Sequence, residues 1–89
     1  MKAIVTVLGK DKVGIIADVA IIMKGYGVNI CDISQTLMQD YFTMIMLVDL
    51  SASTVEFSAL QSKLKAEGEK IGVDIRIQHQ DIFDSMHSI

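Results

Sequence analysis

The chain of 89 residues has few of the residues that build catalytic and metal sites. Its single cysteine, Cys31, excludes an internal disulfide and suits a reducing compartment. Its two histidines, His79 and His87, do not stand at ligand spacing with Cys31 or with each other, so a zinc site lacks its ligand set. No serine or cysteine lies in a nucleophile motif. We therefore expect no catalysis, no bound metal and no cofactor.

Basic residues are also few and scattered. Eight Lys and Arg stand against eleven Asp and Glu, and no basic cluster marks a contact with a phosphate backbone, so direct nucleic-acid binding is not expected. The N-terminal apolar pattern breaks at Gly9, too early for a signal peptide or a membrane span, so we expect a cytoplasmic protein without a membrane partner.

Hydrophobic residues, in contrast, are abundant. They make up 51% of the chain, which is more than the core of so small a domain can hide. We expect a second subunit or a ligand to cover part of this apolar surface.

The most informative motif is the turn Gly9-Lys10-Asp11-Lys12-Val13-Gly14-Ile15-Ile16, between an apolar strand and an apolar helix. Gly9 and Gly14 permit backbone angles and close approaches that a Cβ blocks, and the unpaired N–H groups of the first helical turn attract an anion. Isoleucines follow Gly14 where a phosphate loop has Lys and then Ser or Thr. Asp11 repels phosphate but pairs with an ammonium, so a free amino acid fits the turn. The alternative is that the glycines only make a tight turn and a close helix-to-strand contact.

Hydrophobic periodicity predicts six elements and a tail. The strands are Ala3–Leu8, Val28–Gln39, Tyr41–Leu50 and Val73–Gln80; the helices are Val13–Lys24 and a segment from the capping box Ser53–Glu56 to Gly72; the tail is 81–89. The first and third strands are apolar on both faces, which predicts central strands covered on both sides. The second strand is irregular near Cys31 and Asp32, which indicates a bulge and an edge position.

The first helix is apolar on two sides. Its predicted core stripe is Ile16, Val19, Ala20 and Met23. The face that a lone subunit exposes carries Ile15, Ile21 and Ile22. We expect this face to be buried in a symmetric dimer together with the edge of the second strand. The expected interface residues are Ile15, Ile22, Cys31 and Ile33.

The tail is too apolar for a free end in water. Its helical stripe is Ile82, Met86 and Ile89, beside Phe83. We expect it to dock as a short helix.

The order βαββαβ, with right-handed crossovers, predicts an α+β fold of the ferredoxin-like type. Such a fold has a four-stranded antiparallel sheet with both helices on one face. The first and third strands lie in the centre of the sheet, and the second and fourth strands form its edges.

From Lys2 to Gln80 the chain resembles the ACT domain, a small regulatory module of amino-acid metabolism. The resemblance rests on the turn described above, on Gly27-Val28-Asn29-Ile30 at the start of the second strand, and on the hairpin that follows. Asp32–Thr36 and Phe42–Met46 are similar in particular to the stand-alone bacterial ACT proteins, a group similar to the glycine-cleavage regulatory proteins.

This resemblance implies an ACT domain over residues 1–80, followed by the tail at 81–89. It also implies a homodimer formed through an edge strand and the first helix, with a small effector beside the turn. By resemblance the ligand positions are Asp11, Gly14, Ile15 and Asn29. We therefore expect a non-catalytic domain that senses an amino acid or a similar small metabolite. The alternative is an interaction module that docks on a partner protein without a small-molecule ligand.

Overall fold

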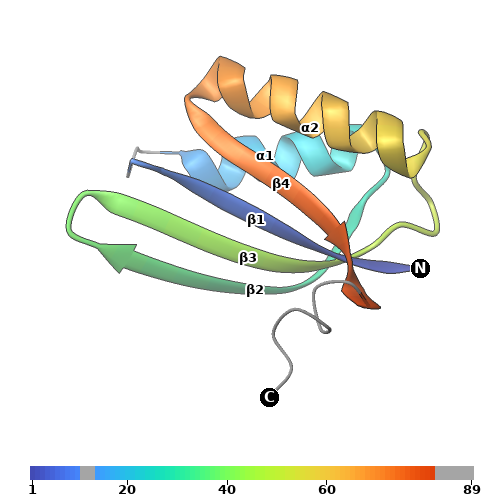
Figure 1. The fold of residues 1–89 in the computed structure, drawn as a ribbon, viewed down its shortest axis with the longest axis horizontal. Coiled ribbons are helices and arrows are strands. Elements are labelled where there is room, and N and C mark those ends of the chain that lie inside the picture. The colour runs from blue at the N-terminus through green and yellow to red at the C-terminus, as the bar shows by residue number, and fades with distance from the viewer. Residues whose placement is uncertain (11–13, 82–89) are drawn as a thin grey trace.

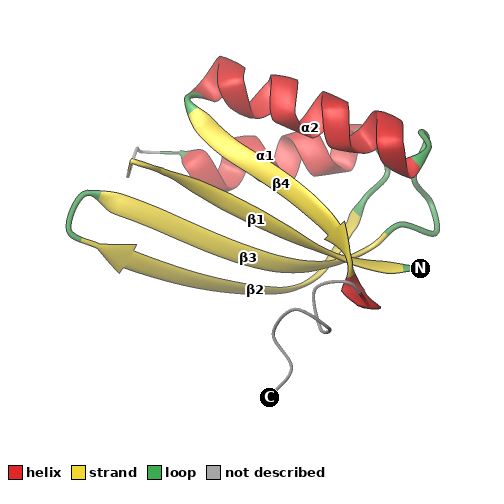
Figure 2. Cartoon of the chain, in the orientation of Figure 1, coloured by secondary structure: helices red, strands yellow, loops and turns green. Residues whose placement is uncertain are grey.

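The computed structural model describes residues 1–10 and 14–81, which form four strands and two helices in the order βαββαβ. The elements are β1 (Lys2–Lys10), α1 (Ile15–Gly25), β2 (Asn29–Met38), β3 (Tyr41–Asp49), α2 (Phe57–Ile71) and β4 (Val73–His79). The strands form one antiparallel sheet in the order β2-β3-β1-β4, and both helices lie on one face of it (Figure 1, Figure 2). The predicted ferredoxin-like fold is confirmed, with β1 and β3 central.

The hydrophobic core lies between the sheet and the two helices. Successive residues of a strand point to opposite faces of the sheet, so every second residue of β1 and β3 enters this core. Core side chains that are at most 1% exposed include Val5, Val7, Val19, Met23, Met44, Met46, Leu60 and Leu64. Two of the hairpin methionines are therefore core residues.

Helix α1 is rotated from the orientation that its sequence predicted. Ile15, Val19 and Met23 are its buried residues, whereas Ile16 is 41% exposed and Ala20 is half-buried. The predicted core stripe is thus correct for Val19 and Met23 and wrong for Ile16. Successive helical residues are turned by about 100° from each other, so Ile15 and Ile16 cannot both face the sheet. In the structure it is Ile15 that faces the sheet.

The other face of the sheet is covered by neither helix (Figure 1). It carries Leu8 of β1 and Ile45 of β3, which are 47% and 38% exposed. The prediction that β1 and β3 are covered on both sides is therefore wrong at Leu8 and Ile45, whereas Ile4 on the same face is only 9% exposed. Right-handed crossovers place both helices on the same side of the sheet, which leaves the second side open.

Helix α2 begins later than its capping signal predicted. It starts at Phe57, and Ser53 does not cap it. The Ser53 hydroxyl instead donates a hydrogen bond of 2.9 Å to the carbonyl oxygen of Val55, in a local turn before the helix. The predicted end of the helix is confirmed, since Gly72 adopts the left-handed conformation at its C-terminus.

Three expectations concern residues outside the described ranges. They are the role of Asp11, the start of the first helix at Val13, and the docking of residues 82–89 as a short helix.

Candidate functional site

Gly14 stands at the N-terminus of α1 in a left-handed conformation, with φ 86° and ψ 3°. Its carbonyl oxygen accepts the first helical hydrogen bond, 2.9 Å from the Asp18 nitrogen. No described side chain caps this end of the helix. A Cβ built on Gly14 meets no atom within 4 Å, so the space beside its Cα is open. The N–H groups of the first turn, which include that of Ile15, have no acceptor within the helix, and such groups attract an anion.

Gly9 lies inside the sheet and not in the turn. It belongs to β1, opposite Phe42 of β3 and Val73 of β4. A Cβ on Gly9 would lie 2.8 Å from Val73 Cγ1. Gly9 thus allows β1 and β4 to pack closely, a contact between two strands and not the helix-to-strand contact that the sequence suggested as the alternative.

A groove runs between α1 and β2 on the helix side of the sheet. It has a volume of about 530 Å³ and begins at Gly14. Its other lining residues are Ile15, Ile16, Ala17, Ala20, Gln35, Leu37 and Phe42. The exposed fractions of Ile16 and Leu37, 41% and 60%, show that the walls of this groove are apolar surface open to solvent.

Asn29 lies at the opposite end of the sheet from the turn. It pairs with Asp49 of β3, whereas Gly9 and Leu37 both pair with Phe42. Phe42 and Asp49 are seven residues apart along one strand, a distance of about 23 Å at the usual rise of a strand. Within one subunit, the structure therefore brings Gly14 and Ile15 together but keeps Asn29 far from them.

The surroundings of Asn29 are polar and charged. Its side-chain amide lies 3.9 Å from Cys31 Sγ, which also accepts from the Lys2 ammonium at 3.3 Å. Opposite Asn29, Asp49 accepts hydrogen bonds from the hydroxyl and the backbone N–H of Ser51, and these bonds lower the pKa of the Asp49 carboxyl. This end of the sheet thus presents both hydrogen-bond donors and a carboxylate.

The expected interface residues fall into two groups. Cys31 and Ile33 lie exposed on β2, at the sheet edge. Ile15, in contrast, is only 4% exposed, and Ile22 packs half-buried against the core. The expected exposure on a lone subunit is therefore wrong for Ile15 and correct for Ile21, which is 69% exposed, because α1 is rotated from its predicted orientation.

The sequence did not show which side of α1 faces β2. The structure puts Ile16, Ala17 and Ala20 on this flank. These residues follow the buried set Ile15 and Val19 by one or two positions, and so lie about 100–200° around the helix from it. The isoleucines of α1 make several sides of the helix apolar, so the hydrophobic pattern alone did not identify the side that faces β2.

The two edges of the sheet differ in what covers them. In β2, every residue from Cys31 to Met38 is exposed, and the predicted bulge is confirmed by a register shift between Ile30 and Asp32. Among the described residues, no side chain is hydrogen-bonded to the backbone of residues 34–38. Such an uncovered edge strand is a template for pairing with another strand.

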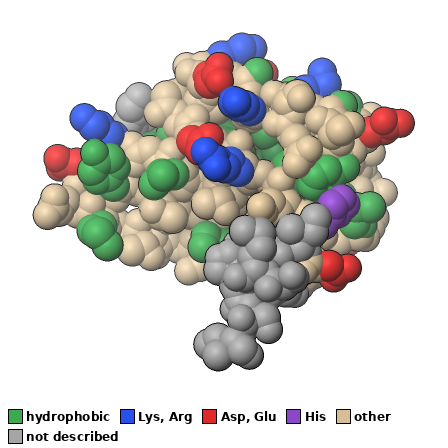
Figure 3. Space-filling view, in the orientation of Figure 1, with side chains coloured by type: hydrophobic (Ala, Val, Ile, Leu, Met, Phe, Trp, Pro, Cys, Tyr) green, Lys and Arg blue, Asp and Glu red, His purple; other side chains and the backbone are tan. Residues whose placement is uncertain are grey.

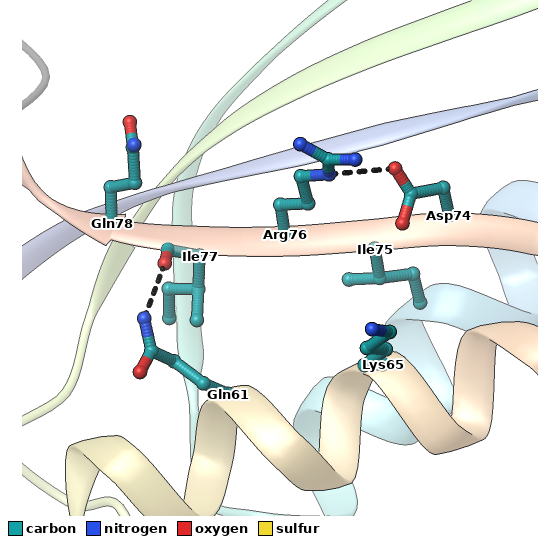
Figure 4. Close-up of a pocket in the computed structure, with 7 residues that line it drawn as sticks. All are labelled: Gln61, Lys65, Asp74, Ile75, Arg76, Ile77 and Gln78. Carbon is teal, nitrogen blue, oxygen red and sulfur yellow. Dashed lines mark hydrogen bonds and ion pairs between the residues drawn. The ribbon is translucent and has the colours of Figure 1, made fainter.

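The edge formed by β4 is partly occupied by α2. Gln61 of α2 donates a hydrogen bond of 3.2 Å to the carbonyl oxygen of Ile77, across a hollow of about 340 Å³ (Figure 4). On the side of β4 that faces away from α2, Arg76 and Asp74 form an ion pair of 2.8 Å. The edge available for pairing is therefore β2.

Other kinds of site find no support in the described residues. Residues 1–10 and 14–81 contain no group of three His, Cys, Asp or Glu that could hold a metal ion. His79 stacks on Phe57, with ring centroids 3.9 Å apart. On the face shown in Figure 3, the Lys and Arg side chains are interspersed with Asp and Glu. Within the same ranges, no helix is long and apolar enough to span a membrane.

Comparison with known proteins agrees with the βαββαβ fold. The sequence profile of the ACT domain family matches residues 2–78. The chain belongs to the ACT domain family. ACT domains generally bind small-molecule effectors and dimerise, and proteins of the family are regulatory.

Relatives of this ACT domain match it along nearly all of its length. A UPF0237 protein of Clostridium acetobutylicum is 57% identical over 89 residues, which is the whole of both chains. The solved structure of an ACT domain protein from Streptococcus pneumoniae is 45% identical, covers 94% of each chain and has a TM-score of 0.83. A protein described as a glycine cleavage system transcriptional repressor has a TM-score of 0.70 over 86% of this chain and 44% of its own; at 22% identity this likeness shows the fold alone.

Proposed function

We propose that this ACT domain is a non-catalytic regulatory module that binds an amino acid or a similar small metabolite at the interface of a homodimer. The observation that carries the proposal is the separation of the expected ligand residues. Asn29 lies about 23 Å along the sheet from Phe42, which lines the same groove as Gly14. A site that uses both needs a second subunit.

The uncovered edge of β2 supports a two-fold dimer. An edge strand with free backbone groups pairs with its own copy in antiparallel fashion when the subunits are related by a two-fold axis. The groove beside it adds apolar surface to the same contact, since Ile16, Ala17 and Leu37 are exposed in one subunit. This interface differs from the one expected from sequence, because it uses the exposed residues Ile16 and Ala17 of α1 in place of Ile22, while the buried Ile15 only lines the groove.

Antiparallel pairing also brings the two halves of the site together. Gly14 lies at the Leu37 end of β2, since both residues line the same groove. Antiparallel strands place the start of one against the end of the other, so Asn29 of the partner subunit comes to the Gly14 end. Each dimer then has two equivalent sites at its interface.

The chemistry of the site favours a carboxylate-bearing ligand. The N–H groups at the head of α1 bind the carboxylate, and Asp11 takes an ammonium group. The amide of the partner subunit's Asn29 donates or accepts according to its orientation. A free amino acid supplies both charges on neighbouring atoms.

The interface is tested first. Ala17 is exposed in one subunit, so Ala17→Glu leaves the fold intact but places a charge in the dimer contact. We expect light scattering to give the mass of a dimer for the wild type and of a monomer for this variant. Ile21→Glu is the matched control, because Ile21 is 69% exposed on the same helix but does not line the groove. A wild-type monomer at high concentration, or a dimeric Ala17→Glu variant, would contradict the interface.

The site itself is tested by mixing subunits. The twenty amino acids are screened by calorimetry and thermal shift; a ligand at ten times its Kd adds about 1.4 kcal/mol of stability. Asp11→Ala and Asn29→Ala should each abolish binding of the compound found. Their equimolar mixture forms heterodimers with one intact site, so about a quarter of the wild-type sites should return. No recovery would contradict a site shared between subunits.

The same screen also tests the alternative, a module that docks on a partner protein without a small-molecule ligand. If the protein is a dimer and no amino acid or common nucleotide changes its melting curve or gives heat, the metabolite-binding proposal fails. The module that docks on a partner protein then takes its place.

A further inference from the structure

The helix-free face of the sheet is apolar where two central residues meet. Ile4 of β1 and Leu47 of β3 are cross-strand partners on this face. Ile4 is 9% exposed and Leu47 is half-buried, and neither belongs to the core between sheet and helices. Their strand neighbours Val5 and Met46 enter that core, so Ile4 and Leu47 point the other way. Leu47 thus leaves apolar surface in the middle of a sheet face that neither helix covers, and a further apolar group can pack there beside Ile4.

The chain leaves the sheet beside this pair. His79, the last residue of β4, pairs with Ala3, the neighbour of Ile4. A hollow of about 240 Å³ marks the same place and is lined by Met1, Lys2, His79, Gln80 and Asp81. The residues that follow Asp81 therefore start at the rim of the helix-free face.

The eight residues after Asp81 match this face in pattern and in length. Ile82, Met86 and Ile89 share one stripe at helical spacing. Eight residues of helix span about 12 Å, which crosses two strand spacings of ~4.8 Å and reaches from β4 over β1 to β3. The Ile4–Leu47 pair lies within this reach. Leu8 lies four residues along β1 from Ile4, about 13 Å away, towards the other end of the sheet.

We propose that residues 82–89 dock on the helix-free face of their own subunit, over Ile4 and Leu47. This contact uses the helix-free face, whereas the proposed dimer contact uses the β2 edge and the flank of α1, so it stands whether or not the metabolite-binding proposal holds.

A single introduced tryptophan reports on this contact in the full chain, because the protein has no other tryptophan. In Phe83→Trp, we expect blue-shifted emission and poor quenching by acrylamide. Adding Leu47→Lys to this protein should shift the emission to the red and raise quenching several-fold. The matched control Ile21→Lys changes an exposed residue on the opposite layer and should leave both signals unchanged.

A second variant guards against misfolding. If Leu47→Lys loses its circular dichroism, Met86→Lys disturbs the contact from the side of the tail and should expose the tryptophan in the same way. If the tryptophan of the Phe83→Trp protein is quenched as readily as free tryptophan amide, the proposal is overturned. Protection that disappears on dilution also overturns it, because the tail then docks on another subunit. If the tryptophan is exposed and Leu47→Lys halves the mass, a second copy covers the face.

Discussion

Replacing Gly14 with alanine tests whether the head of α1 needs a conformation that only glycine adopts freely. The φ of Gly14 is 86°, and an added Cβ meets no atom within 4 Å, so the cost of the change comes from the backbone alone. The left-handed conformation costs an L-residue roughly 1–2 kcal/mol. In a domain of this size each kcal/mol lowers Tm by about 4–8 °C. We therefore expect Gly14→Ala to lower Tm by roughly 4–16 °C.

Gly25→Ala is the matched control on the same helix. Its Cβ position is equally open, but its φ is not positive. Alanine should raise the free energy of unfolding there, by about 0.5–1 kcal/mol, because it restricts the unfolded chain and favours helix. Thermal and urea unfolding are followed by circular dichroism at one protein concentration, since the Tm of a dimer depends on concentration. Equal stability of Gly14→Ala and the wild type would refute the reasoning.

Two further changes test the packing and the charges of the fold. Gly68→Ala should lower the free energy of unfolding by about 1–3 kcal/mol in urea titrations. The reason is that its Cβ would lie 2.7 Å from the carbonyl oxygen of Val73, where α2 packs on β4. An unchanged urea midpoint would show that α2 and β4 can move apart enough to accept the methyl group. The bonds from Ser51 lower the pKa of Asp49 below its ordinary 3.8, so the stability they add is present above that pH and is lost as pH falls through the lower folded value. Asp49→Asn should therefore weaken the fall of Tm with acid, and parallel Tm curves for the two proteins would count against this role.

The order of the elements could be predicted from sequence because local signals determine it. Apolar runs of strand and helix period, separated by Gly14, Gly27 and Gly72, specify βαββαβ without knowledge of contacts. Right-handed crossovers then leave one arrangement of central and edge strands. The bulge was predictable for the same reason, since Ile30 and Ile33 stand out of phase within a single strand.

The turn at the head of α1 was also predictable, whereas the rest of the site was not. Glycine at a helix start is a local requirement of the backbone. Which side of α1 faces the sheet depends on how the whole helix packs, and a helix with isoleucine at four positions around its axis offers several apolar sides. Packing selected Ile15 for the core and left Ile16 beside β2.

Sequence by itself thus determined the topology, the edge position of β2 and the glycine that begins α1. Tertiary structure alone decided that Asn29 stands at the far end of the sheet from Gly14. This separation follows from how strands pair, because antiparallel register sets distances between residues that no local pattern contains.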